Sequence, residues 1–408
     1  MRIAIWHNLP SGGGKRALYN HVRGLVARGH TIEAWCPPTA DQTYLSLGDL
    51  ISEHIVPLTL PTRSDWDRRL RIPAKIDPLL AAMDDHSRAC ADQISGGGFD
   101  ILFAHACMFV RTTAIARFLK LPKVLYLQEP FRSLFEALPR LPWLAPPPSE
   151  LRLLSLGRLR EEALDRRTLH NARIQAREEV RNAAGFDRIL VNSFFSRESI
   201  LRAYGLDAEV SYLGTDLARF ADQGRQRENF VIGLGSFTPE KNLHLVIEAL
   251  ALLPAPRPEL AWVGNAVHQN TLDEMMFLAA SRGVSFTPHV KIPDDELVGL
   301  LNRASALIYA PRLEPFGFAP IEAGACGLPV IAVAEGGVRE TVIDDETGLL
   351  VHNAPRAVAD AVARLLADPA LVHRLGTAGR ANAERRWSLD AATDRIEQAL
   401  LLSTAAFR

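Results

Sequence analysis

The fold is decided by residues 309–337, which read Tyr-Ala-Pro-Arg-Leu-Glu-Pro-Phe-Gly-Phe-Ala-Pro-Ile-Glu-Ala-Gly-Ala-Cys-Gly-Leu-Pro-Val-Ile-Ala-Val-Ala-Glu-Gly-Gly. An apolar run at residues 306–309 predicts a buried strand, which leads into a polar loop at 312–317. A helix follows near residues 319–326, and then a second buried strand at 329–333. The polar residues of this strand–helix–strand unit gather at a strand end, where open parallel sheets bind ligands.

Two acidic residues, Glu314 and Glu322, lie on either side of the start of this helix. Each carboxylate can accept two charge-assisted hydrogen bonds, which suits a pair of adjacent sugar hydroxyls. Between them, Phe316, Gly317 and Phe318 offer backbone N–H groups at a helix start, which suits a phosphate. The alternative is a pair of solvated carboxylates, which leaves the intervening Phe-Gly unexplained. The pattern favours a nucleoside diphosphate that carries a sugar.

A known family shows the same arrangement of motifs. The sequence Glu-x7-Glu with Phe-Gly inside it, followed by Glu-Ala-x-Ala-x-Gly-x-Pro-Val, resembles the family-4 retaining glycosyltransferases, or glycosyl transferases group 1. The resemblance is strong over residues 231–351 and thinner before them. It implies the GT-B fold, a nucleotide-sugar donor, and a transfer that needs no metal or cofactor. It also implies that Glu322 holds the ribose diol and Glu314 the sugar hydroxyls.

Bulk composition bounds the possible classes of protein. A chain of 408 residues is too long for one hydrophobic core and suits two domains of about 200 residues. Its net charge of −1 gives no long-range attraction to nucleic acid, so a nucleic-acid partner is not expected. The first residues are typical of a short strand rather than a signal peptide, and no run approaches the roughly 18 apolar residues of a membrane span. We expect a cytoplasmic protein.

The cysteines give no indication of a metal centre. They are scattered, with no Cys-x-x-Cys pair and no histidine at metal-ligand spacing, and no Asp-x-Asp metal site occurs in the loops expected near the ligand. We interpret them as buried, reduced thiols. The four residues are Cys36, Cys90, Cys107 and Cys326.

Three glycines, residues 12–14, follow the first strand and precede a helix that starts near Lys15. Glycines let a ligand approach the backbone, and a helix N-terminus favours an anion. The loop is neither Gly-x-Gly-x-x-Gly nor a Walker loop, and a plain turn is the alternative. Beside the two glutamates it resembles the Gly-Gly loop that the family places next to the donor phosphates and the acceptor. Gly13 and Gly14 are therefore predicted to bind the donor.

A second predicted site in the first half lies after a strand at residues 123–127, which follows a predicted helix near 112–119. Family members often carry a histidine at the position of Gln128, close to the C6 hydroxyl of the sugar. Glutamine can donate a hydrogen bond there but does not titrate. By resemblance, the catalytic residues are Gln128, Glu314 and Lys241.

In the second half, Lys241 lies where a predicted strand gives way to a helix. It resembles the lysine of the family motif Gly-Arg-x-x-x-x-Lys, whose two cations neutralise the diphosphate. Ser236 stands in place of the arginine, so it supplies a hydrogen bond but no charge. Arg312, Lys15 and Arg16 are candidates to compensate. A surface lysine is the alternative interpretation.

Two further positions follow from the resemblance. Asn265 replaces the last glycine of the family's Val-Gly-x-Gly, after a strand that ends near residue 264. In members of the family, the backbone at the positions of His289 and Val290 contacts the edge of the nucleobase. A loop histidine with no role is the alternative for His289.

Strand and helix patterns alternate on both sides of a predicted hinge at residues 214–229. We therefore expect two doubly wound, Rossmann-like α/β domains that face a central cleft. Residues 1–215 form the predicted acceptor-side domain, and residues 216–388 the nucleotide-sugar domain. In the family, the terminal helix, here 389–408, packs back on the first domain.

An arginine-rich amphipathic stretch at residues 150–184 follows a proline-rich segment at 138–148. A solvated helix face with ion pairs four residues apart is one interpretation. The other is a peripheral contact with anionic lipid at the inner face of the membrane, with Leu141, Trp143 and Leu144 at the interface. That contact would suit a lipid-linked acceptor.

The expected function is transfer of a hexose from GDP-mannose or a UDP-hexose to a glycan, lipid-linked or small-molecule acceptor. Two alternatives keep the fold. A non-catalytic nucleotide-sugar-binding module is suggested by Gln128 and Ser236 together. A sugar-nucleotide epimerase or a phosphorylase also has two such domains, although no motif indicates the lysine-bound pyridoxal phosphate that a phosphorylase needs.

Overall fold

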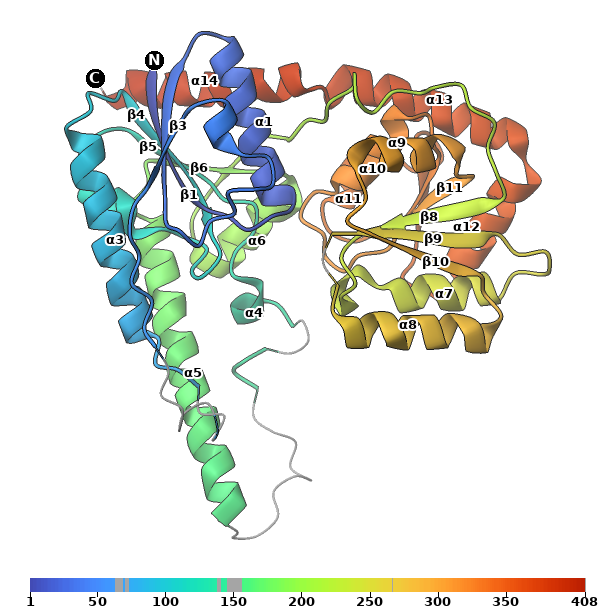
Figure 1. The fold of residues 1–408 in the computed structure, drawn as a ribbon, viewed down its shortest axis with the longest axis horizontal. Helices are drawn as coiled ribbons and strands as arrows, with labels where there is room; N and C mark the ends of the chain where they lie inside the picture. The colour runs from blue at the N-terminus through green and yellow to red at the C-terminus, as the bar shows by residue number, and fades with distance from the viewer. Residues whose placement is uncertain (63–68, 70–72, 138–140, 145–155, 266, 408) are drawn as a thin grey trace. The chain divides into compact units, whose positions relative to one another are not determined.

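The computed structural model describes residues 1–62, 69, 73–137, 141–144, 156–265 and 267–407. The chain forms two compact units. The N-terminal unit comprises Met1–Val191, Arg197–Ser211 and Arg395–Arg408, and the C-terminal unit comprises Asn192–Ser196 and Tyr212–Asp394. In each unit helices cover both faces of a parallel sheet (Figure 1), so the predicted α/β, doubly wound fold class is confirmed.

The sheet of the N-terminal unit has the strand order β3-β2-β1-β4-β5-β6-β7. Strands β1 and β4 at its centre are buried almost throughout, which is why they read as continuous apolar runs in the sequence. The strands are β1 Arg2–Asn8, β2 Thr31–Cys36, β3 Ser52–Ile55, β4 Ile101–Cys107, β5 Lys123–Tyr126, β6 Arg188–Val191 and β7 Glu209–Val210.

The helices of this unit differ from prediction at one place. The predicted helix at 112–119 is a short 3₁₀ helix, Ala114–Phe118. It begins at Ala114 because Thr113 is its N-cap, whose side chain accepts a hydrogen bond from Ile115 N at 3.3 Å. The α-helices with residues in this unit are α1 Gly13–Ala27, α3 Asp77–Ser95, α4 Arg132–Phe135, α5 Leu156–Ala183, α6 Phe194–Tyr204 and α14 Leu389–Phe407. The start of α6, up to Ser196, and the start of α14, up to Asp394, belong to the C-terminal unit.

The last part of α14 packs within the N-terminal unit. Glu397 on this helix accepts from Arg28 Nη1 and lies next to His30 Nε2, each at 2.7 Å. These contacts tie α14 to the segment that joins α1 to β2.

The arginine-rich stretch forms α5, and its first half carries exposed charges. Residues 145–155, which include the start of this stretch and the end of the proline-rich segment, lie outside the described residues. Trp143 and Leu144 are exposed. Among the helices that the structure describes, none combines the length and the apolar character that crossing a bilayer demands.

The sheet of the C-terminal unit has the strand order β10-β9-β8-β11-β12-β13. Helices α7, α8 and α12 pack on one face and α9, α10 and α11 on the other, each over its own apolar cluster (Figure 1). The strands are β8 Phe230–Leu234, β9 Glu259–Gly264, β10 Phe286–Val290, β11 Ala306–Tyr309, β12 Val330–Val333 and β13 Gly348–Val351. The helices are α7 Leu243–Ala251, α8 Gln269–Arg282, α9 Asp294–Arg303, α10 Phe318–Ala325, α11 Val338–Thr341, α12 Pro355–Ala367 and α13 Pro369–Arg386.

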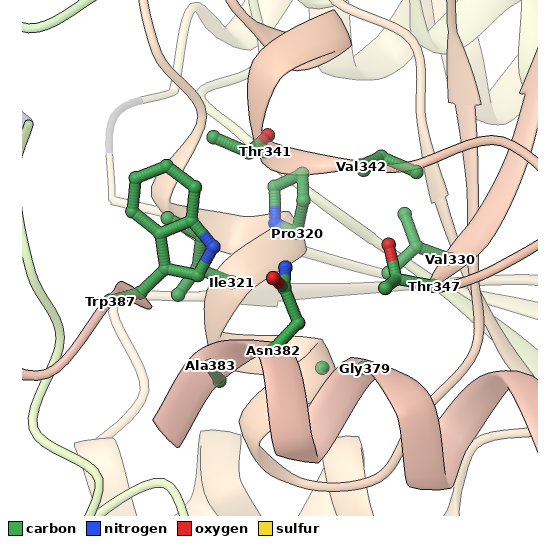
Figure 2. Close-up of a pocket in the computed structure, with 11 residues that line it drawn as sticks. Pro320, Ile321, Val330, Thr341, Val342, Thr347, Gly379, Asn382, Ala383 and Trp387 are labelled. Carbon is green, nitrogen blue, oxygen red and sulfur yellow. The ribbon is translucent and has the colours of Figure 1, made fainter. Parts of the chain in front are cut away.

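Helices α10 and α13 approach closely through glycines. A Cβ at Gly324 would lie 3.3 Å from Gly379 O, and a Cβ at Gly376 would fall on the carbonyl oxygen of Gly327. Beside this contact is a cavity of about 10 Å³, lined by residues that include Asn382 and Trp387 (Figure 2). Ligand pockets measure about 300 to 1,000 Å³, so this cavity is too small for a sugar nucleotide and belongs to the packing.

The close approach of α10 and α13 can be tested with Gly376→Ala. We expect this variant to lose about 1 to 3 kcal/mol of stability, because the added methyl group meets backbone that cannot move aside easily. Gly299→Ala on α9 is the matched control, since nothing lies within 4 Å of its Cβ and alanine favours a helix. Thermal unfolding followed by circular dichroism measures both. Equal melting temperatures for the two variants would contradict the packing argument.

Candidate functional site

The site residues predicted in the second half gather at one edge of the C-terminal sheet. Its strands are all parallel, so their carboxyl ends share that edge, where open α/β sheets bind ligands. These residues are Ser236 and Lys241 after β8, Asn265 after β9, His289 and Val290 at the end of β10, and Glu314, Phe316, Gly317, Phe318 and Glu322 after β11.

A direct contact joins two of them. Lys241 Nζ lies 2.7 Å from Glu314 Oε2, and both side chains are largely buried. Lys241 ends a 3₁₀ turn, Pro239–Lys241, rather than beginning α7 as predicted. Its aliphatic stem crosses Gly235, where a Cβ would come within 2.8 Å of Lys241 Cγ. The glycine therefore leaves room for the ammonium group to reach the carboxylate.

The turn after β12 holds the loop that carries Glu314. Glu335 accepts a hydrogen bond from Arg312 Nε at 2.9 Å and a longer one from Leu313 N at 3.4 Å. Gly337 N donates to Glu314 O at 2.8 Å. Because these contacts hold the loop backbone at Leu313 and at Glu314 itself, Glu314 is positioned before any ligand arrives.

Backbone strain marks the same loop. Leu313 has φ of 48° and Gly317 has φ of 94°, both in the left-handed region. For a leucine this conformation costs on the order of 1 to 3 kcal/mol, and such strain clusters at functional sites. Gly336, with φ of 63°, packs so tightly that a Cβ would fall on the Glu314 backbone.

A second set of contacts connects the turn of Lys241 to Glu335. Asn242 Nδ2 donates to Asn353 Oδ1 at 3.1 Å, and Asn353 Nδ2 donates to Glu335 Oε1 at 3.1 Å. The turn of Lys241 and the loop of Glu314 are thus both fastened to Glu335. The sequence analysis missed Glu335 and Asn353, although Glu335 stands directly before the Gly-Gly pair.

The missing arginine at Ser236 is not replaced by a free cation from Arg312. The Arg312 guanidinium is already ion-paired with Glu335, at 2.9 Å. Ser236 Oγ lies 3.4 Å from Thr238 Oγ1. The other two candidates, Lys15 and Arg16, are in the N-terminal unit, and Lys15 is completely buried.

Residues 316–318 combine a buried aromatic ring, that of Phe316, with the uncapped N-terminus of α10. Phe316 is 2% exposed, and its ring packs 5.6 Å from the rings of Phe318 and Trp387. Gly317 precedes α10, which has no side-chain cap. The N–H groups in the first turn of α10 therefore favour an anion, as predicted for a phosphate.

Glu322 lies on α10 and is buried at 2% exposure. It is close to Tyr309, whose pKa is raised well above its usual value by burial and then by the charges of Glu314 and Glu322. The negative charges of Glu314 and Glu322 therefore both disfavour ionisation of the Tyr309 hydroxyl, so both carboxylates lie near this side chain. The ribose role of Glu322 stays a prediction.

The remaining predicted residues of this unit are at the β9–β10 side of the edge. The register pairs His289 with Val263 and Val290 with Gly264, and Lys291 N donates to Gly264 O at 3.0 Å. His289 Nδ1 lies 3.8 Å from Glu296 Oε1. Asn265 is exposed.

In the N-terminal unit, Gly13, Gly14 and Gln128 line one pocket of about 200 Å³. A Cβ at Gly14 would lie 3.7 Å from Gln128 Oε1, so the glycine loop and the glutamine face each other directly. Arg111 and Glu129 also line the pocket, and Arg111 Nη2 is 2.6 Å from Glu129 Oε1. This unit thus groups the predicted Gly-loop and Gln128 at one site.

A buried carboxylate orders this pocket. Glu179 on α5 accepts from Arg111 N at 2.7 Å, Thr112 N at 2.9 Å and Tyr204 Oη at 3.2 Å, and burial raises its pKa. Of the two interpretations of residues 150–184, the solvated helix face is wrong for Glu179, which is fully buried. Arg111 was missed because no motif surrounds it.

Comparison with known families decides the identity. The model described as Glycosyltransferase Family 4 matches residues 11–219, just over half of the chain. The chain belongs to glycosyltransferase family 4. The model described as Glycosyl transferases group 1 matches residues 215–382 of this family-4 protein.

Among similar proteins, a D-inositol 3-phosphate glycosyltransferase from Streptomyces bingchenggensis is 34% identical over 52% of this chain and 52% of its own. A GDP-mannose-dependent alpha-(1-6)-phosphatidylinositol monomannoside mannosyltransferase from Mycolicibacterium smegmatis is 33% identical over 50% of this chain and 58% of its own. The chain thus spans about half the length of these curated relatives. The structure of sucrose-phosphate synthase from Thermosynechococcus elongatus has the same fold, with a TM-score of 0.73, 20% identity and 99% of each chain covered.

The contacts of Glu335 predict how the Glu314 loop responds to mutation. In Glu335→Gln the charge that pairs with Arg312 is lost, so we expect faster amide hydrogen exchange across residues 312–317. Glu346→Gln is the matched control, because Glu346 is exposed and lies outside this network. Hydrogen exchange followed by mass spectrometry measures both. Unchanged protection in Glu335→Gln would show that the loop is held by other contacts.

Proposed function

We propose that this family-4 protein transfers a hexose from a nucleotide diphosphate sugar to an acceptor hydroxyl, with retention of the anomeric configuration. The observation that carries the proposal is the contact between Lys241 and Glu314 at the edge of the C-terminal sheet. A cation and a carboxylate 2.7 Å apart match a ligand that carries a phosphate next to sugar hydroxyls.

The proposed roles follow from charge and position. The Lys241 ammonium stabilises the negative charge that grows on the departing diphosphate, together with the uncapped N-terminus of α10. Glu314 accepts hydrogen bonds from the sugar hydroxyls and orients the ring. Glu322 accepts hydrogen bonds from the ribose diol. The fastening of both Lys241 and Glu314 to Glu335 supports this, because preorganised charges need no rearrangement during the reaction.

The proposed chemistry balances without a protein nucleophile. The bond between the anomeric carbon and the phosphate oxygen breaks, and the acceptor oxygen bonds to the same face of that carbon. The acceptor's proton passes to the departing phosphate oxygen. The protein's contribution is therefore positioning and electrostatic stabilisation.

The donor and the acceptor are proposed at class level. The relative from Mycolicibacterium smegmatis is named as GDP-mannose-dependent, which supports GDP-mannose as the first donor to test, before UDP-hexoses. We propose that the pocket of the N-terminal unit binds the acceptor. Its polar lining, which includes Gln128, Arg111 and Glu129, suits a polyhydroxylated acceptor such as a glycan, a lipid-linked sugar or a small polyol.

A non-catalytic sugar-nucleotide-binding protein is the second candidate. Ser236 brings no charge, and Arg312 is paired with Glu335. The cation that Lys241 supplies would then serve binding without turnover.

Turnover tests the proposal. After a thermal-shift screen of GDP-mannose and UDP-hexoses selects the stabilising donor, the purified protein is expected to release nucleoside diphosphate slowly without acceptor. Lys241→Met should lower this rate on the order of 10²-fold, because the departing charge loses its cation. Lys120→Met is the matched control, as Lys120 is exposed in the other unit. Binding of a donor without any release would favour the second candidate.

The ribose role of Glu322 can be tested with a thermodynamic cycle. Glu322→Gln should weaken binding of the nucleoside diphosphate by about 1 to 3 kcal/mol, measured by calorimetry. A 2′,3′-dideoxy nucleotide should bind the wild type more weakly but should lose little further affinity in the variant. Additive losses would place the diol elsewhere. Circular dichroism checks that the buried substitution leaves the fold intact.

A further inference from the structure

Three potential metal ligands meet on neighbouring strands in the N-terminal unit. His7 is in β1, Cys36 ends β2 and Glu53 is in β3, and these strands are adjacent in the sheet. His7 Nε2 lies 2.9 Å from Glu53 Oε1, and Cys36 Sγ lies 3.6 Å from the same oxygen. One ligand atom from each residue lies within 4.8 Å of the other two.

The cluster is shielded from solvent. His7 and Cys36 are fully buried, and the Glu53 side chain is 6% exposed. His7 Nδ1 has no hydrogen-bond partner among the described residues. Burial, with the charge of Glu53, raises the pKa of the Cys36 thiol to about 12. Such a group of polar atoms is costly to bury unless it is fully paired or holds an ion.

We propose that His7, Cys36 and Glu53 form a binding site for a divalent transition metal of the zinc class. Thiolate sulfur, imidazole nitrogen and carboxylate oxygen are the donor atoms that Zn²⁺ prefers. In a tetrahedral zinc site the ligand atoms lie roughly 3.3 to 3.7 Å apart, given the usual bond lengths. The separations of 2.9 and 3.6 Å are near that range, and the third, between His7 and Cys36, is at most 4.8 Å. Ligand shifts of about 1 Å would therefore bring all three donor atoms to zinc-binding distance, with a water molecule as the fourth ligand.

Lys15 decides how tightly this site holds a cation. Its side chain is completely buried, and Nζ has no hydrogen-bond partner among the described residues. Its charge acts on Glu53, Cys36 and His7. The lysine therefore balances the Glu53 carboxylate without a metal and repels a metal when one binds. Lysine and metal compete for the same negative charge.

A metal at the proposed site would make the glycine loop that lines the pocket of the same unit more rigid. β1 continues from His7 through Asn8 to the pocket-lining residues that begin at Leu9, and Lys15 is on the first turn of α1. A metal that ties β1, β2 and β3 together would stiffen the base of the glycine loop. The proposal is independent of the proposed transfer reaction.

The alternative is a metal-free hydrogen-bond network. In it Glu53 accepts from His7, and Gln42 Nε2 donates to Cys36 Sγ at 3.3 Å. This network needs no ion, and it predicts that added metal neither binds at the cluster nor changes the melting temperature.

The test titrates the full, chelator-treated protein with Co²⁺ and then displaces it with Zn²⁺. We expect a thiolate-to-cobalt charge-transfer band at one equivalent, which Zn²⁺ removes, and a higher melting temperature with Zn²⁺. Cys36→Ser should abolish the band. Cys326→Ser should retain it, because Cys326 is a buried, free thiol of the other unit. No band in the wild type, or a band that persists in Cys36→Ser, overturns the proposal.

Lys15→Met gives a second readout that does not depend on the fold of Cys36→Ser. Removing the competing cation should tighten Co²⁺ binding roughly tenfold or more. Glu53→Gln should weaken it, because one anionic ligand is lost. Unchanged affinity in Lys15→Met would place the bound metal away from this cluster and would also overturn the proposal.

Discussion

The C-terminal site depends on the contact between the Glu335-Gly336-Gly337 turn and the backbone of the loop that carries Glu314. Only glycine allows the left-handed turn at Gly336 to approach that backbone so closely. Glu335 then fastens both the loop and, through Asn353, the turn of Lys241. The geometry of the Lys241–Glu314 pair is a consequence of this arrangement.

Both units have to provide hydrogen-bond partners for loop backbone at the edge of a parallel sheet, and they do so in similar ways. Each exposes polar loops at the carboxyl edge of a parallel sheet, where loop backbone needs hydrogen-bond partners. In each, a carboxylate supplies such a partner: the partly buried Glu335 accepts from Leu313 N, and the buried Glu179 accepts from Arg111 N and Thr112 N. A charged acceptor makes stronger hydrogen bonds than a neutral one, which explains why carboxylates hold both loops. The polar groups at the two sheet edges are therefore positioned by carboxylates that hold the loop backbone.

The strand–helix–strand structure of residues 309–337 was predicted correctly from the sequence. The reason is that β11, α10 and β12 are short, consecutive elements bounded by glycine and proline. The motifs also predicted Lys241 and Glu314 as site residues, and the structure places these two side chains in contact. Glu179 was misjudged because a helix rich in charges reads as solvated, whereas its burial depends on the loop that packs over it. Arg312 illustrates the same limit, since its ion pair with Glu335 spans 23 positions and leaves no local pattern.

Local patterning was enough to predict the alternating strands and helices of two doubly wound units, because hydrophobic periodicity and turn residues act over a few positions. The family and most of the candidate site residues were predicted from the resemblance of the motifs, which are also local in the sequence. The three-dimensional arrangement decided which charges are already paired, which carboxylates hold loops, and that His7, Cys36 and Glu53 converge. Those features depend on strand order, since parallel strands bring together residues that are tens of positions apart, and no short-range pattern encodes that order.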